Sequence, residues 1–136
     1  EKIKQAGIVG MGGATFPCHV KLCPPPGEKA ECVIINAVEC EPYLTSDHSL
    51  MLEKADEILV GVALIMKAVG VERGYIGIEN NKPDAILLMT EKAKAYPQIE
   101  VVPFKDISRF RKEWNAVNTI SRHHPVIPQR MKSERK

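Results

Sequence analysis

Three short apolar segments, separated by two helical segments, constrain the fold of this chain more than any other feature. The apolar segments have the character of buried strands and are residues 32–36, 74–79 and 99–102. Residues 45–69 place apolar side chains three and four positions apart, which predicts a long helix that Ser46 or Asp47 caps. A second helix is predicted from Pro83 to about Ala95.

The order strand, helix, strand, helix, strand is typical of a mostly parallel sheet with crossover helices. We therefore expect an α/β chain with a Rossmann-like three-layer fold, preceded by a glycine-rich loop. The domain is expected to occupy residues 1–104. Residues 105–136 carry nine Lys or Arg against three acids and show no sustained period, so we assign them to a basic tail of uncertain structure.

The glycine-rich loop has four glycines within residues 7–13, and each would cost a helix interior about 1 kcal/mol. Residues without Cβ let backbone N–H groups approach an anion, and Lys21 adds a cation nearby. The loop lacks the G-x-G-x-x-G spacing and the Lys-Ser/Thr ending of common nucleotide loops. It predicts either a phosphate-binding loop or a simple tight turn.

Two polar segments follow the first and second predicted strands. They are Asn36-Ala37-Val38-Glu39-Cys40-Glu41 and Glu79-Asn80-Asn81-Lys82. Ligands of open parallel sheets bind at the carboxyl ends of strands, and neighbouring acids are costly to hold together unless they bind something. Taken singly, the first segment is explained as well by an exposed turn, and the second is explained better by a turn rich in Asn. A fold that places both segments and the glycine loop around one crevice favours a binding site.

Other classes of function receive little support. The four cysteines, Cys18, Cys23, Cys32 and Cys40, form no Cys-x-x-Cys pair, so we expect reduced thiols in a cytoplasmic protein and no metal. No apolar run reaches the roughly 18 residues of a membrane-spanning helix, and we expect no direct membrane insertion. The basic tail is better explained as a solvated extension than as a nucleic-acid-binding segment.

Three longer segments carry a resemblance to a known family. They are GIVGMGGATFPCHVKL, IINAVECEPYLTSDHSLMLE and IGIENNKPDAI, all within residues 5–104. Together they resemble the C subunit of the Rnf-type electron transport complex, in the family's order and spacing. This family is related to the flavin-bearing, NADH-oxidising subunit of respiratory complex I, which has a similar GGAGFP loop. The resemblance implies a noncovalent FMN with NADH stacked on it for hydride transfer, and no catalytic side chain.

The resemblance also implies which residues hold the cofactors. The phosphate and ribityl side of FMN would lie against Gly10, Gly12, Gly13, Phe16 and Lys21. The flavin would touch Asn36 and Glu39, while Glu41 would lie nearer the nicotinamide nucleotide. The second-strand motif of the family is matched by Glu79 and Asn80.

Several positions depart from the family's pattern. Cys18 stands where the family usually has Thr, and Thr15 stands where Gly is commoner. A β-branched residue at that position is expected to restrict the loop and weaken flavin contact. After Phe104 the resemblance ends, and the two cysteine sets that hold 4Fe–4S clusters in the full-length family are not in this chain. We therefore expect a chain truncated before the iron–sulfur region.

The function implied by the resemblance is FMN and NADH binding within a membrane-associated ferredoxin–NAD oxidoreductase. The parent protein would lie on the cytoplasmic face of the bacterial cell membrane, held there by the other subunits of the complex. The isolated fragment is expected to be inactive, and its exposed sheet edge could form a homodimer. Two alternatives stay open: the corresponding part of a cobalamin reductase, and a folded remnant or assembly module without bound cofactor.

Overall fold

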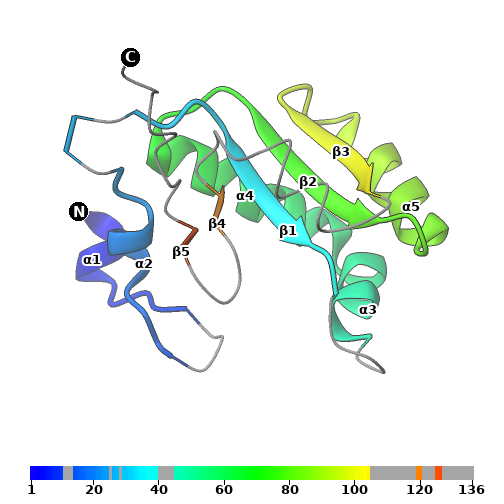
Figure 1. The fold of residues 1–136 in the computed structure, drawn as a ribbon, viewed down its shortest axis with the longest axis horizontal. Coiled ribbons are helices and arrows are strands. Elements are labelled where there is room, and N and C mark those ends of the chain that lie inside the picture. Colours follow the sequence, from blue (N-terminus) through cyan, green and yellow to red (C-terminus); the bar gives the residue numbers. More distant parts are fainter. Residues whose placement is uncertain are drawn as a thin grey trace, which may run out of the picture.

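A central parallel sheet organises the chain. The computed structural model describes residues 1–10, 14–24, 26–27, 29–39, 45–104, 119–120 and 125–126. The sheet's three long strands are β1 (Val33–Ala37), β2 (Gly74–Glu79) and β3 (Ile99–Phe104). All pair in parallel, and the strand order is β3-β2-β1-β4-β5 (Figure 1). The predicted α/β fold with a parallel sheet is confirmed.

The far edge of the sheet is formed by two short strands from the stretch that the sequence assigned to the tail. β4 (Thr119–Ile120) pairs in parallel with β1, and β5 (Pro125–Val126) pairs antiparallel with β4. The opposite edge is β3, which continues two residues past its predicted end. Because β3 is an edge strand, Pro103 is tolerated within it despite lacking an N–H donor.

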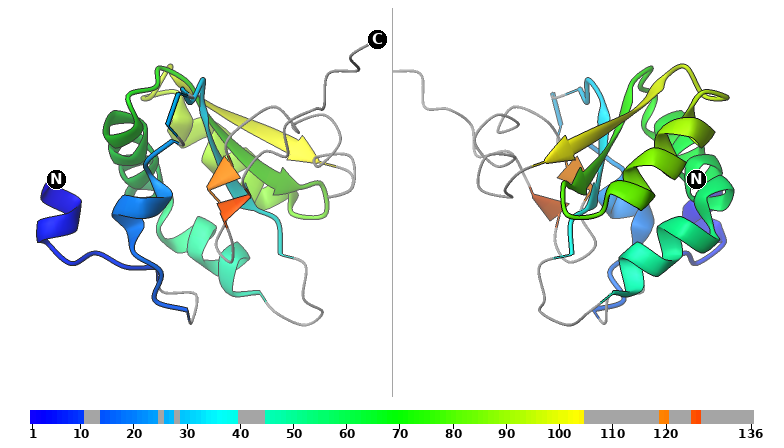
Figure 2. Two further views of the ribbon diagram at one scale, coloured as in Figure 1. Left: turned by 60° about the vertical axis from the view of Figure 1, so that its left-hand side comes forward. Right: turned by 90° about the vertical axis from the view of Figure 1, so that its right-hand side faces the viewer.

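The crossover helices cover one face of the sheet. These are α4 (Ala55–Val69) and α5 (Pro83–Ala93), with α3 (Ser46–Glu53) beside them, and Figure 2 shows all three on the same side of the strands. Alternate strand residues point to them, since side chains along a strand alternate between its faces. The largest members of this core with under 2% of their surface exposed are Val33, Leu59, Ile76, Ile78 and Met89. A smaller cluster of Cys32, Ile34 and Phe104 lies on the other face.

The prediction of one continuous helix over residues 45–69 is wrong. The chain leaves helical geometry at Lys54, with φ −128° and ψ 30°, between α3 and α4. Two features stabilise a new helix start there: Asp56 and Glu57 lie in the first turn of α4, where acids are favoured, and Lys54 pairs with Glu57. The break lets α3 pack against α5 while α4 packs along the sheet and also against α5. As predicted, Gly70 ends α4 in the left-handed conformation.

The N-terminal segment holds two short helices, α1 (Lys2–Gln5) and α2 (Cys18–Lys21), which contact each other. Neither helix contains a buried residue, and Figure 1 shows them together at one end of the molecule. Within the described ranges, none of the helices has the length and apolar character that a membrane span requires.

Candidate functional site

The carboxyl ends of β1 and β2 meet around one lysine. The Nζ of Lys82 lies 3.0 Å from Oε2 of Glu39 and 3.9 Å from Oε2 of Glu79. Glu39 follows β1 and Glu79 is the last residue of β2, so the two polar segments that the sequence singled out lie side by side. The side chains of Lys82 and Glu39 are only 11% and 6% exposed. Buried charges of this kind require partners, and each supplies the other's.

The second oxygen of Glu39 binds the start of α3. Oε1 accepts a hydrogen bond of 2.9 Å from the backbone N–H of Asp47 and one of 3.4 Å from Oγ of Ser46. The prediction that Ser46 or Asp47 caps this helix is therefore wrong: Thr45 is the N-cap residue without a side-chain bond, and a carboxylate from the β1 loop caps the helix instead. A negative charge is favourable at a helix N-terminus.

The environment of Glu39 favours its ionised form. Burial alone would raise the pKa of this carboxyl. The backbone N–H of Asp47 and the Lys82 ammonium outweigh burial, and the N–H of His48 contributes, so the pKa lies below the ordinary value. Glu39 is thus held as a carboxylate with a fixed direction.

Asn36 shapes the turn that leads to Glu39. Its Oδ1 accepts a 3.0 Å hydrogen bond from the backbone N–H of Val38, in the manner of an Asx turn. Asn36 also belongs to β1, where it pairs with Gly77 of the neighbouring strand. The half-buried Asn36 is therefore anchored at the carboxyl edge of the sheet.

The loop after β2 is tied to β3. The backbone N–H of Asn80 donates to the carbonyl of Phe104 at 2.8 Å, and the N–H of Lys82 donates to the carbonyl of Glu79 at 3.1 Å. Asn81 donates to the carboxylate of Glu79 at 3.4 Å. Asn80 is exposed, while the side chain of Glu79 is 26% exposed. Both can be reached by a ligand at this edge.

The ends of the glycine loop are closed by a short antiparallel bridge between Val9 and Pro17. Gly10 N–H donates to the carbonyl of Phe16 at 2.8 Å. The Nζ of Lys21 lies 5.7 Å from the centre of the Phe16 ring, and a Cβ added to Gly10 would come within 2.8 Å of the same Nζ. The structure therefore brings Gly10, Phe16 and Lys21 together, whereas Gly12, Gly13 and Glu41 lie outside the described residues.

The described site residues form two groups. Asn36, Glu39 and Glu79 belong to the carboxyl edge of the sheet, and Gly10, Phe16 and Lys21 belong to the loop. The hydrogen bonds described for residues 1–10 and 14–24 lie within that segment, and those described for the carboxyl edge join β1, β2, β3, α3 and α5. Lys82 lies in a polar segment that the sequence singled out, but it was not among the residues expected to hold a cofactor. The sequence feature that could have indicated its role is a lysine three residues after a glutamate at the end of a strand.

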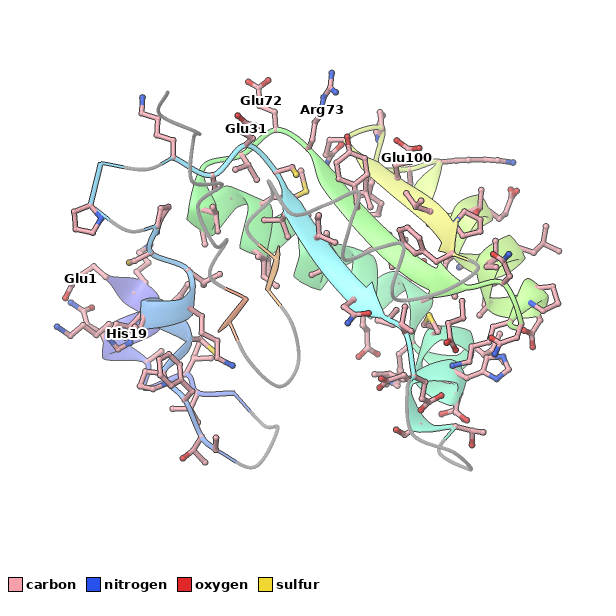
Figure 3. The ribbon with its side chains drawn as sticks, viewed as in Figure 1. Glu1, His19, Glu31, Glu72, Arg73 and Glu100 are labelled. Carbon is pink, nitrogen blue, oxygen red and sulfur yellow. The ribbon has the colours of Figure 1, made fainter. Side chains whose placement is uncertain are left out.

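The opposite edge of the sheet carries a second set of charged side chains. Figure 3 shows Glu31, Glu72, Arg73 and Glu100 gathered at the amino ends of the strands. An open cavity of about 600 Å³ lies among the last three and Gln98. Ligands of open parallel sheets bind at the carboxyl ends, so this cavity is at the less favoured edge. No cluster of three or more His, Cys, Asp or Glu suited to a metal occurs among the described residues.

Comparison with known proteins identifies relatives of this chain. The family described as the Nuo51 FMN-binding domain matches residues 3–121. The C subunit of the Na+-translocating ferredoxin:NAD+ oxidoreductase complex of Acetobacterium woodii is 52% identical over 99 residues, which are 73% of this chain and 22% of the relative. The C subunit of the proton-translocating ferredoxin:NAD+ oxidoreductase complex of Clostridium ljungdahlii is 55% identical over 100 residues, 74% of this chain and 22% of the relative.

Solved structures agree on the fold. The NAD+-reducing nickel–iron hydrogenase in its air-oxidized state superposes with a TM-score of 0.59 at 24% identity, covering 74% of this chain and 19% of the hydrogenase chain. This likeness supports the Rossmann-like fold alone. The chain spans only about a fifth of the length of the relatives named above. These relatives are C subunits of ferredoxin:NAD+ oxidoreductase complexes, as the sequence motifs led us to expect. The resemblance to the Rnf-type C subunit is therefore confirmed, and the chain belongs to the Nuo51 FMN-binding domain family.

Proposed function

We propose that this chain is the FMN-binding domain of an Rnf-type C subunit and that NADH delivers hydride to the FMN it binds. The family to which the chain belongs supports FMN as the cofactor. The relatives named as ferredoxin:NAD+ oxidoreductase subunits support a nicotinamide nucleotide as the partner of the flavin.

The observation that carries the proposal is the position of Lys21. Its ammonium lies against Gly10, where any Cβ would displace it, and beside the ring of Phe16. In the described ranges no carboxylate forms an ion pair with Lys21, so its charge is available to an anion. A lysine beside a glycine loop is suited to a phosphate, because the ammonium and backbone N–H groups can both donate to it.

The residues present therefore fit FMN. Its phosphate and ribityl chain would be held by Gly10, Gly12, Gly13, Phe16 and Lys21. Its ring would contact Asn36 and Glu39, with Glu79 and Asn80 nearby and Glu41 toward NADH. The bound flavin would supply the redox chemistry, since it accepts a hydride and passes on single electrons. The side chains bind the phosphate, orient the ring and place donors and charges around it.

The place of the domain in a larger assembly is also a proposal. The relatives are named as subunits of ion-translocating complexes, and the matched residues are about a fifth of their length. We infer that partner subunits hold the complete protein on the cytoplasmic face of the membrane. Iron–sulfur clusters that accept electrons from the flavin would be held by parts of the complete protein outside this chain.

The test is a titration of the purified chain with FMN, followed by visible absorbance and then by anaerobic NADH. We expect saturable binding, and bleaching of the flavin band when NADH is added. Lys21→Met should weaken FMN binding about tenfold, because a charge-assisted contact to the phosphate is lost. Binding without bleaching would contradict the NADH half of the proposal alone. No saturable binding would contradict both halves.

A cofactor-free assembly module is the second candidate, and two observations favour it. Thr15 has φ +48°, a left-handed conformation that is strained for a β-branched residue. Four apolar side chains of the N-terminal segment are also exposed: Ile8, Val9, Phe16 and Val20. If strain at Thr15 has removed cofactor binding, Thr15→Gly should restore it. Equal FMN affinity of Thr15→Gly and the wild type would contradict that explanation.

A further inference from the structure

Lys82 occupies a position that is unfavourable for a lysine unless its charge has a specific partner. It directly precedes Pro83, the first residue of α5, and is the N-cap residue of that helix without a side-chain cap bond. The N-terminus of a helix repels a positive charge. Lysine is also rarely this deeply buried without a partner. The contact with Glu39, across 43 positions of sequence, offsets both costs.

The consequence is a three-way junction between separate elements. Glu39 comes from the loop after β1, its Oε1 binds the first turn of α3, and its Oε2 binds Lys82 at the start of α5. Fixing both oxygens of one carboxylate fixes the path of the backbone that links Asn36 to Glu39. These are the residues proposed to meet the flavin.

Lys82 also sets the charge of this edge. Glu39 and Glu79 both approach its ammonium, so the three groups carry a net charge of −1. Without the ammonium two carboxylates would remain, and an anionic dinucleotide or flavin phosphate would be repelled more strongly.

We propose that Lys82 is a positioning residue of the cofactor site. It acts through Glu39, whose carboxylate it holds against α3, and it lowers the negative charge that an anionic cofactor meets. This inference rests on the proposed function. It adds a residue that does not itself contact the flavin.

The test compares FMN dissociation constants of Lys82→Met, Lys82→Arg and the double variant Glu39→Gln/Lys82→Met. Lys82→Met should bind FMN about tenfold more weakly, and Lys82→Arg should recover part of the loss because it keeps the charge. The double variant removes one charge of each sign. The net charge of the edge is therefore unchanged, and any weakening that the double variant retains reports the lost contacts of the Glu39–Lys82 pair rather than a change of charge. The double variant also serves if Lys82→Met fails to fold.

A second readout does not depend on FMN. The Asp47 amide resonance should titrate with Glu39 because the two are hydrogen-bonded. Its midpoint should move to higher pH in Lys82→Met, since an ion-pair partner that lowers the pKa of Glu39 is removed. The matched control is Lys94→Met, which removes an exposed lysine of the same helix region that pairs with Glu91. It should change neither readout.

The outcomes separate the two proposals. A wild-type chain that binds no FMN contradicts the proposed function and, with it, the role of Lys82 in binding. Wild-type binding together with undiminished affinity in Lys82→Met contradicts the role of Lys82 alone. A shifted Asp47 midpoint with unchanged FMN affinity also contradicts the inference, because it leaves Lys82 with a structural role only.

Discussion

The ammonium of Lys82 lies 3.0 Å from the carboxylate of Glu39, and both side chains are almost fully buried. The pair joins the loop after β1 to the start of α5, and Glu39 extends the connection to α3. The carboxyl edge of the sheet is therefore held by charged contacts in addition to the apolar packing of Ala37, Met51 and Ala85.

Removing one member of this pair should destabilise the fold strongly. Lys82→Met leaves the Glu39 carboxylate buried without its ion-pair partner, and we expect a loss of about 3 kcal/mol in the free energy of unfolding. Glu39→Gln should cost a similar amount. The double variant Glu39→Gln/Lys82→Met should lose markedly less unfolding free energy than the sum of the two single losses, because no unpaired charge remains from the pair. Urea denaturation measures all three, and simple additivity would contradict a direct interaction.

Acid should weaken the same junction. The folded-state pKa of Glu39 lies below its ordinary value of 4.5, so ionised Glu39 contributes stability above about pH 4.5, and this contribution is lost as pH falls through the folded pKa. The difference in unfolding free energy between wild type and Glu39→Gln should therefore have its full value near neutral pH and shrink below about pH 4.5. Denaturation curves between neutral pH and about pH 3 test this. A difference independent of pH would contradict it.

A second group contributes to the acid response and needs its own control. The hydrogen bond from His48, 2.9 Å from Oδ1 of Asp84, lowers the pKa of that exposed carboxyl. Asp84→Asn removes this contribution while leaving Glu39 in place. In the Asp84→Asn variant, the loss of stability at low pH that we attribute to Glu39 should persist.

Gly10→Ala should impair FMN binding without unfolding the domain. The new Cβ would come within 2.8 Å of Nζ of Lys21, the mobile end of a long side chain, so the ammonium moves and the backbone does not. We expect an FMN dissociation constant about tenfold higher and a stability change below about 0.5 kcal/mol. Fluorescence titration and urea denaturation measure the two quantities. An unchanged dissociation constant would show that the position of Lys21 is unimportant for binding.

Two glycines of the α/β core should respond in opposite ways to alanine. At Gly74 a Cβ would lie 2.6 Å from Sδ of Met66 and 3.3 Å from Cγ1 of Val62, so Gly74→Ala overpacks the contact between β2 and α4. We expect Gly74→Ala to lower the free energy of unfolding by about 1–3 kcal/mol. Gly61 lies inside α4 with nothing within 4 Å of the added atom, and Gly61→Ala should stabilise by about 0.5–1 kcal/mol. Equal effects of the two substitutions would contradict the described packing.

The sequence predicted the features of the fold that depend on local pattern. The strand at Gly74–Glu79 follows from a short apolar segment, and the stop at Gly70 follows from the conformational freedom of glycine; both were predicted correctly. The break at Lys54 was missed because apolar spacing continues across it. What separates α3 from α4 is that α3 packs on α5, whereas α4 packs on the sheet as well as on α5.

The site was predictable in position and less so in its internal contacts. The placement of Asn36, Glu39 and Glu79 at one edge follows from strand order alone. The role of Glu39 as the cap of α3 and the burial of Lys82 depend on residues 8 and 43 positions away. No local rule connects residues at such separations. The glycine loop shows the same limit, since the contact between Gly10 and Lys21 arises only when the chain folds back on itself.

We propose that FMN binds between the glycine loop and the carboxyl edge of the sheet. Mapping amide resonances during an FMN titration tests it most directly. We predict saturable shifts at Gly10, Phe16 and Lys21 and at Asn36 and Glu39, with none at Arg73 or Glu100 on the opposite edge. Absence of saturable shifts, or shifts confined to the opposite edge, would contradict the account.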